Sequence, residues 1–153
     1  MNASAGPAQP RLSSETVHAS TVAIEGRAVL ITGPSGAGKS DLALRLLDRG
    51  FALISDDQTI VRRDGERLIA SPPPAIAGKL EIRGIGIIEM DHVSDLPVAL
   101  LVELTSDIQR LPDDARERPL LGISLPLISI DAMAASAPSK VALALDRMGL
   151  KVE

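Results

Sequence analysis

The chain of 153 residues contains no cysteine, no tryptophan and no tyrosine, and its single phenylalanine is Phe51. The absence of cysteine excludes disulfide bonds, thiolate catalysis and zinc or iron–sulfur sites built on cysteine. The near absence of aromatic rings argues against single-stranded nucleic-acid binding, which relies on stacking bases on such rings. The core must therefore be packed from Leu, Ile, Val and Ala.

An excess of positive charge is also lacking, since 16 Lys and Arg stand against 20 Asp and Glu, a formal net charge of −4. Such a chain has no large positive field with which to hold a polyphosphate backbone, so we expect no nucleic-acid partner. The longest apolar stretch near the middle, Pro97–Val102, is far shorter than the roughly 18 residues that a membrane span needs. We expect a cytoplasmic protein with no membrane association.

Length and composition predict a single domain. With 45% hydrophobic residues, 153 residues supply one ordinary core and are too few for two domains of typical size. The first dozen residues, Met1 to Leu12, are rich in Ala, Pro, Ser and Gly and have no apolar region that could form a signal peptide. We expect a disordered arm over residues 1–13 and one domain over residues 14–153.

A glycine-rich segment carries the strongest functional signal. It fits the Walker A pattern and lies between an expected buried strand, 28–32, and an expected amphipathic helix that ends before Gly50. Its backbone N–H groups can converge on phosphate oxygens, its lysine can contact the β- and γ-phosphates, and its serine can bind Mg²⁺. A glycine turn that binds nothing would explain neither of these two side chains. The segment is Gly33-Pro34-Ser35-Gly36-Ala37-Gly38-Lys39-Ser40.

Two adjacent carboxylates follow the next expected strand, 51–55. These are Asp56 and Asp57, placed where α/β sheets present ligands, at the carboxyl end of a strand that we expect beside the strand before the Walker A loop. Phosphoryl transfer needs one group to complete the metal shell and another to deprotonate or orient the acceptor. The pair can supply both, although a solvated strand end or a helix cap would show the same pattern.

The remaining segments suggest further strands and a closing helix. Val17–Ile24 alternates as a strand with one buried face does, and an Asp64-Gly65 turn joins a hairpin over 59–70. Leu80–Met90 indicates a loop entering a strand. The other expected elements are a buried strand over 98–104, a Pro-containing edge strand over 125–130 and an amphipathic helix over 140–150.

Four further polar residues are ambiguous from the pattern alone. Glu81 and Arg83 could form a salt bridge on a strand edge or belong to a site. A lone histidine on a strand, as His18 is, more often has a structural role. Arg110 is one of several arginines that look exposed.

Taken together, these residues resemble the catalytic domain of bacterial HPr kinase/phosphorylase. The resemblance extends from about Val17 to Met90, and His18 also falls at the family's spacing upstream of Gly33. The most specific segment is similar to the family's identifying motif. The matching segments are Val29–Gly33 leading into the Walker A loop, Arg49-Gly50, Ser55-Asp56-Asp57, and Lys79-Leu80-Glu81-Ile82-Arg83-Gly84-Ile85-Gly86-Ile87-Ile88.

The resemblance implies a P-loop α/β domain of the HPr kinase and phosphoenolpyruvate carboxykinase type, assembled as a hexamer. It implies an ATP-dependent protein serine kinase that acts on HPr, the phosphocarrier of the phosphotransferase system, with Mg²⁺ as cofactor. The residue roles that it implies are phosphate binding by Lys39 and its loop, Mg²⁺ ligation by Ser40 and Glu81, general base catalysis by Asp57, assistance from His18 and Asp56, and charge stabilisation by Arg110.

The sequence departs from the family in three places, one of which is a short terminal helix. Only a short arm precedes the strand with His18, so we expect a truncated form reduced to its catalytic domain. Residues 131–140 lack the Arg/Gly-rich pattern that the family uses for dephosphorylation, which argues against that activity. Two alternatives remain open: a small-molecule P-loop kinase, for which Arg116 and Arg118 would be a meagre lid, and a nucleotide-sensing module that binds ATP without transferring phosphate.

Overall fold

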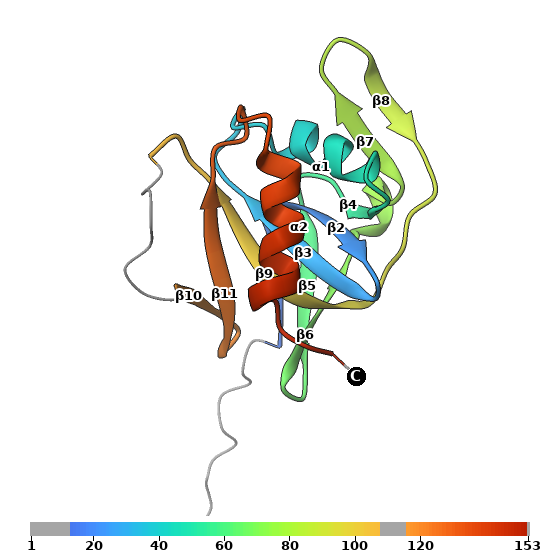
Figure 1. Cartoon of the computed structure of the whole chain (residues 1–153). Helices are drawn as coiled ribbons and strands as arrows, with labels where there is room; N and C mark the ends of the chain where they lie inside the picture. Colours follow the sequence, from blue (N-terminus) through green and yellow to red (C-terminus); the bar gives the residue numbers. More distant parts are fainter. Residues whose placement is uncertain (1–12, 108–115, 153) are drawn as a thin grey trace, which may run out of the picture.

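A mixed β-sheet runs through the centre of the molecule (Figure 1). The computed structural model describes residues 13–107 and 116–152. Its strands are β1 (Ser14–Val17), β2 (Ala19–Ile24), β3 (Arg27–Thr32), β4 (Ala52–Ser55), β5 (Thr59–Asp64), β6 (Arg67–Ser71), β7 (Lys79–Ile82), β8 (Gly86–Glu89), β9 (Leu96–Leu104), β10 (Glu117–Leu120) and β11 (Ile123–Ile130). Its helices are α1 (Lys39–Leu47), α2 (Ala137–Met148) and a short 3-10 helix, η1 (Pro74–Ile76).

Strand order decides which ends meet at the site. The main sheet has the order β1-β5-β6-β9-β3-β2-β4. Strand β11 also pairs with β9, and β10 pairs with β11. Strand β3 pairs in parallel with β9, while β2 pairs antiparallel with both β3 and β4. The expectation that β4 would neighbour β3 is wrong, because β2 lies between them. Since β2 is antiparallel to both, its start meets the carboxyl ends of β3 and β4 at one sheet edge.

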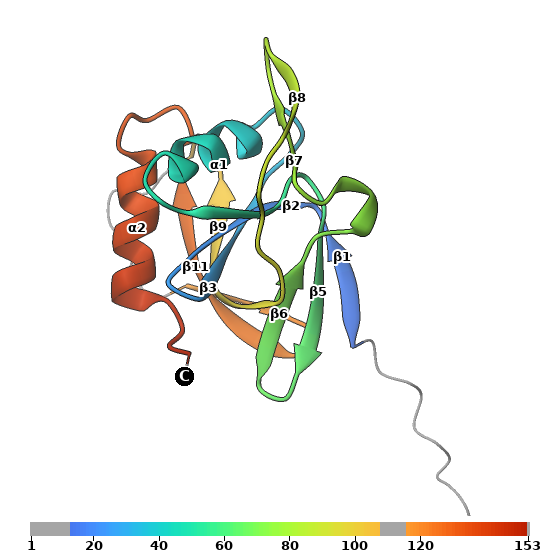
Figure 2. The ribbon, with the colours of Figure 1, turned by 90° about the vertical axis from the view of Figure 1, so that its right-hand side faces the viewer.

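Both faces of the central strands are buried, as the continuous apolar run in β3 predicts. Val29 and Ile31 pack with α1 and α2 on one face, and Leu30 packs with residues of β5, β6 and β11 on the other. Figure 2 shows α2 on one side of β3 and β9, and β1, β5 and β6 on the other. Within the described residues, neither α-helix is long and apolar enough to cross a membrane.

The segment expected as a loop entering a strand is a hairpin, β7–β8, that projects from the body of the protein (Figure 2). The N–H of Ile85 donates to the carbonyl of Ile82 at 3.0 Å. Gly84 has a φ of 88° in that turn, which few residues other than glycine adopt. Leu80 is fully buried and anchors the hairpin, whereas Ile85 and Ile87 are exposed.

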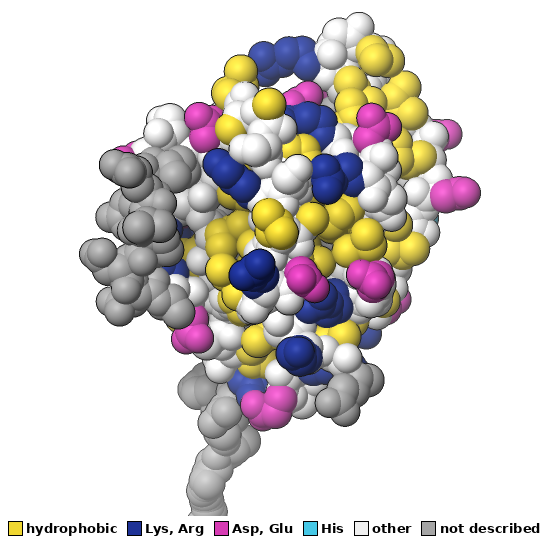
Figure 3. All heavy atoms as spheres, viewed as in Figure 1, with side chains coloured by type: hydrophobic (Ala, Val, Ile, Leu, Met, Phe, Trp, Pro, Cys, Tyr) yellow, Lys and Arg dark blue, Asp and Glu magenta, His cyan; other side chains and the backbone are white. Residues whose placement is uncertain are grey.

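The structure also bears on the expected hairpin, the closing helix and the strand over residues 125–130. The β5–β6 hairpin is confirmed, and α2 begins earlier than expected, with Pro138 in its first turn. Residues 125–130 lie in β11, which pairs with β10 up to Pro126 and with β9 from Leu127, so each part of the strand pairs with one neighbour. Arg110 and residues 1–12 of the expected arm lie outside the described residues. On the face shown in Figure 3, charges of both signs are interspersed.

Candidate active site

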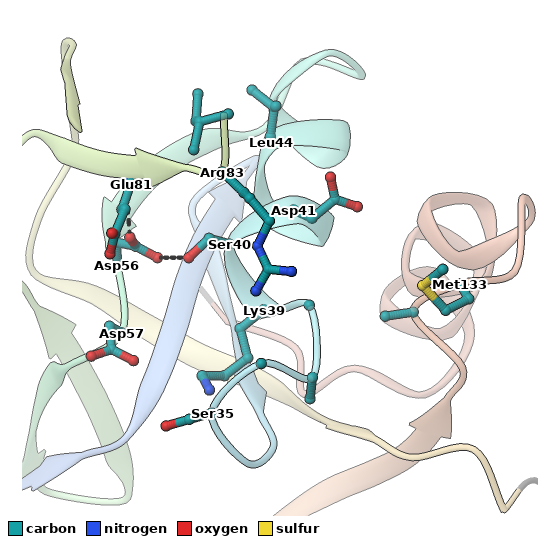
Figure 4. A pocket seen from close by; sticks show the side chains of 15 residues that line it. Ser35, Lys39, Ser40, Asp41, Leu44, Asp56, Asp57, Glu81, Arg83 and Met133 are labelled. Carbon is teal, nitrogen blue, oxygen red and sulfur yellow. Dashed lines mark hydrogen bonds between the residues drawn. The ribbon is translucent and has the colours of Figure 1, made fainter. Parts of the chain in front are cut away.

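The Walker A loop joins β3 to α1 and forms the floor of a pocket of about 680 Å³ (Figure 4). Gly38 has a φ of 103° and directly precedes the helix, so the loop turns sharply and the helix N-terminus faces the pocket. The carboxylates that follow β4 and the start of the β7–β8 hairpin form the opposite wall. The pocket is lined by Ser35, Gly36, Ala37, Gly38, Lys39, Ser40, Asp41, Leu44, Asp56, Asp57, Glu81, Ile82, Arg83, Ala132 and Met133.

Lys39 is buried and folds back onto its own loop. Its Nζ donates to the carbonyl oxygens of Gly33 at 2.9 Å and Pro34 at 3.2 Å. Within the described residues it forms no ion pair with a carboxylate, so both of its partners are neutral. The positive charge of Lys39 therefore remains available to a phosphate group at the loop.

Asp56 is buried among neutral hydrogen-bond donors. Its Oδ1 accepts from the hydroxyls of Ser40 at 2.6 Å and Ser20 at 2.8 Å, and its Oδ2 accepts from the backbone N–H of Glu81 at 3.1 Å. These contacts join α1, β2 and β7 at one carboxylate. Because none of these partners carries a positive charge, the carboxylate can attract a cation.

The donor set near Asp56 fits Mg²⁺ held together with a nucleotide. Within residues 13–107 and 116–152, no group of three or more His, Cys, Asp or Glu side chains is arranged to hold a metal alone. Mg²⁺ in such sites usually takes one or two carboxylates and completes its shell with phosphate oxygens and water. Ser40 and Asp56 in hydrogen-bond contact, with Glu81 lining the same pocket, are a suitable partial set.

Asp57 is presented to solvent beside the pocket floor. The N–H of Gln58 donates to the carbonyl of Asp56 at 2.7 Å, and Asp57 has a φ of 67°, which together describe a tight γ-turn. Nε2 of His18 lies 2.7 Å from Oδ1 of Asp57, and their side chains are 54% and 59% exposed. A carboxylate that is accessible, oriented and hydrogen-bonded to a histidine is suited to accept a proton from an incoming hydroxyl.

The structure thus brings His18, Lys39, Ser40, Asp56, Asp57 and Glu81 to one sheet edge, and the roles assigned to them stay predictions. It also places Ser20 there, which sequence reasoning missed. Ser20 is fully buried; it donates to Asp56 and accepts from the N–H of Asp57 at 3.1 Å. A hydroxyl on an otherwise apolar strand needs a partner when it is buried, and that requirement was the available signal.

Arg83, which the sequence left open between a salt bridge and a site, also lines the pocket. Figure 4 shows its side chain extending from the hairpin over the Walker A loop. The interpretation of Glu81 and Arg83 as a salt-bridged strand edge is wrong, because Arg83 forms no ion pair within the described part of the chain. A guanidinium in this place faces the position where phosphate charge would gather.

A second carboxylate, Glu103, ends the strand next to β3. It accepts hydrogen bonds from Arg118 at 2.8 Å and Ser129 at 3.3 Å, and it lies 3.6 Å from the guanidinium of Arg116. The hydrogen bond from Arg118, followed by charge attraction and the bond from Ser129, holds the pKa of Glu103 below its usual value. The two arginines considered as a lid for a small-molecule acceptor are therefore engaged elsewhere.

Comparisons with known proteins agree with this site. The sequence model of the HPr Serine kinase C-terminal domain matches residues 11–145. An HPr kinase/phosphorylase of Prosthecochloris aestuarii is 36% identical over 126 residues, which are 74% of this chain and 37% of that protein. Another, of Lactiplantibacillus plantarum, is 40% identical over 129 residues, 76% of this chain and 41% of that protein.

A solved structure is similar as well. The Hpr(Ser) kinase/phosphatase of Coxiella burnetii superposes with a TM-score of 0.76 at 32% identity, covering 86% of this chain and 88% of the other. The α/β fold with its nucleotide-binding loop is therefore the fold of that protein. The chain spans well under half the length of the curated relatives that it matches. By the extent of the family match, the chain belongs to the HPr serine kinase C-terminal domain family.

Proposed function

We propose that this protein is an ATP- and Mg²⁺-dependent protein serine kinase whose acceptor is a phosphocarrier of the HPr type. One observation carries the proposal: Asp57, hydrogen-bonded to His18, lies in the same pocket as Lys39 and the Walker A loop. A phosphate donor and a base for the acceptor are thereby adjacent. Membership of the family and the names of the relatives favour the same activity.

The residues divide the reaction between them. The Walker A amides and Lys39 bind the polyphosphate, and Ser40, Asp56 and Glu81 hold Mg²⁺, which neutralises phosphate charge when bound. Asp57 accepts the proton of the acceptor serine hydroxyl. As this proton leaves, the serine oxygen forms a bond to the γ-phosphorus, and the bond between that phosphorus and the oxygen that bridges to the β-phosphate breaks. His18 keeps the Asp57 carboxylate oriented.

Two cations complete this proposal. Arg83 extends over the loop from the hairpin (Figure 4), where its guanidinium would meet the charge of the phosphate chain together with Lys39. Arg110, which lies outside the described residues, keeps the charge-stabilising role that the resemblance implies. We further propose a cytoplasmic homo-oligomer, a hexamer by resemblance, that lacks dephosphorylation activity because residues 131–140 have no Arg/Gly-rich pattern.

The test is incubation of the purified protein with γ-labelled ATP, Mg²⁺ and an HPr-type carrier from the same organism, with mass spectrometry to locate the phosphate. We expect label on a serine of the carrier, lost with the Asp57→Ala variant. Nucleotide binding without label on the carrier would instead favour a nucleotide-sensing module or a different acceptor.

A further inference from the structure

The pocket above the Walker A loop has two chemically different ends. Asp56, Asp57 and Glu81 gather on one side of the loop, and Met133 lies on the opposite side (Figure 4). The Met133 side chain is 89% exposed, although methionine is ordinarily buried in proteins. Met133 therefore offers an accessible apolar side chain at the end of the pocket away from the carboxylates.

The loop that carries Met133 is firmly built. The N–H of Met133 donates to a carboxylate oxygen of Asp131 at 2.9 Å, and the N–H of Ala134 donates to the Asp131 carbonyl at 3.0 Å. The guanidinium of Arg45 on α1 donates to the carbonyls of Ala132 and Ala134. The backbone at Met133 is therefore held at a set position on the pocket wall, and its side chain is free to contact a ligand.

The same loop is joined to the phosphate-binding loop. Ala132 is buried, and a Cβ added to Gly38 would lie only 3.1 Å from the Cβ of Ala132. The guanidinium of Arg45 also forms an ion pair, at 3.0 Å, with the carboxylate of Asp41, which lies in the first turn of α1. The wall with Met133 thus borders the helix N-terminus that would bind phosphates.

The geometry gives a bound nucleotide one direction. Its γ-phosphate must lie toward Asp57, where the acceptor is deprotonated, so its nucleoside leads away from the acidic end and toward Met133. No phenylalanine, tyrosine or tryptophan ring can receive the base, because the chain has only Phe51 of these types and it is 6% exposed. The imidazole of His18 lies at the acidic end, bound to Asp57. A methionine thioether offers a polarisable surface that makes favourable contacts with aromatic rings.

We propose that Met133, on the loop that Arg45 anchors, is the surface on which the nucleobase of the bound nucleotide rests. The direction of the nucleotide rests on the proposed function; the contact itself concerns binding alone. Met133 touches the face of a base and reads none of its edges. Adenine and guanine nucleotides should therefore gain equally from it, and a triphosphate without a base should gain nothing.

The test compares three ligands on the parent protein and four variants by titration calorimetry in Mg²⁺. The ligands are ATP, GTP and inorganic tripolyphosphate. In Met133→Ala we expect ATP and GTP each to bind about fivefold more weakly, the range of sulfur–aromatic contacts. Tripolyphosphate should bind as it does to the parent protein. Met133→Leu keeps most of the apolar surface but removes the sulfur, so its loss should be smaller than that of Met133→Ala but still measurable. Met148→Ala removes another exposed methionine, on α2, and should change nothing.

Arg45→Lys tests the anchoring of the loop, because lysine keeps the charge but cannot bind two carbonyls with one planar group. We expect it to weaken ATP and GTP more than tripolyphosphate. Equal losses for all three ligands, or no loss in Met133→Ala, would overturn the proposal. So would unchanged nucleotide affinity with a raised KM for the carrier, which would assign Met133 to the acceptor surface. If the binding pattern is as expected but no carrier is labelled, the proposed nucleobase site would stand and the proposed kinase activity would be contradicted.

Discussion

Two strands end beside the Walker A loop with a carboxylate, and the two carboxylates are in different surroundings. Strand β9 neighbours β3 and ends near Glu103, which is bound by two guanidinium groups. Strand β4 lies two strands from β3 and ends at Asp56, which is bound by two hydroxyls and a backbone N–H. Distance from the loop along the sheet therefore does not decide which acid can serve a metal.

The difference is one of charge. A carboxylate paired with arginine has its charge compensated inside the protein, and the pair holds strands together. A carboxylate held by neutral donors keeps both its position and its net charge. From this comparison we expect the end of β4 to carry the chemistry and the end of β9 to carry stability.

The largest effect should come from Asp57. Asp57→Ala removes the base at the end of β4, and we expect the rate of phosphate transfer to the carrier to fall by about 10³-fold, within the range of general base catalysis. ATP affinity should change by less than about threefold, because the Walker A loop is untouched. The measurements are single-turnover transfer and calorimetry of ATP binding. Full activity in Asp57→Ala would show that the base is another group.

The second effect concerns the metal, and Asp56 and Glu103 offer a matched pair of amide substitutions. Asp56→Asn removes the charge that we assign to Mg²⁺ binding, and the Mg²⁺ concentration for half-maximal transfer should rise by about 10- to 100-fold. Glu103→Gln should leave that concentration within about twofold of the parent. Mg²⁺ titrations of the transfer rate decide the matter. If both variants shift it equally, the contrast between the two strand ends fails.

A substitution of Ser20 on β2 tests whether its hydroxyl is needed to position Asp56 and Asp57 at the end of β4. Ser20→Ala removes a donor to Asp56 and an acceptor for the N–H of Asp57. We expect kcat to fall by roughly tenfold, from misplacement of the two carboxylates, while the Kd for ATP stays within about twofold. A steady-state kcat together with calorimetry separates this from a general loss of structure, which would weaken ATP binding as well.

The smallest effect concerns the pH dependence of stability at Glu103. The pKa of Glu103 lies below its usual value of 4.5, so its ionised form stabilises the fold above that pH, and the contribution is lost as pH falls through the lowered pKa. Glu103→Gln should therefore reduce the free energy of unfolding at pH 7 by less than about 1 kcal/mol, since the pair is partly exposed. Urea unfolding at pH 7 and pH 4 should give a smaller difference at the lower pH. A difference that grows toward pH 4 would contradict the assignment.

The local parts of this architecture could be predicted from the sequence. The Walker A loop, the helix after it and the Asp56–Asp57 pair are each encoded in short contiguous segments with characteristic residue types. The position of β2 between β3 and β4 could not be inferred, because strand pairing depends on contacts between distant segments. The hydrogen bonds of Ser20 follow from that pairing. The ion pairs of Glu103 with Arg116 and Arg118 depend instead on the pairing of β9 with β11 and of β11 with β10. A salt bridge between Glu81 and Arg83 looked natural in the sequence, yet the Arg83 side chain extends over the Walker A loop (Figure 4).

The hydrogen bond from the Glu81 N–H to Asp56 has a consequence for experiment. This amide proton is held by a side chain, whereas most protected amides are held by a backbone carbonyl in a helix or sheet. Its exchange with deuterated solvent therefore depends on whether the Asp56 carboxylate stays in place. A single backbone amide in the hairpin can thus report, by NMR or mass spectrometry, when Asp56 changes its partners.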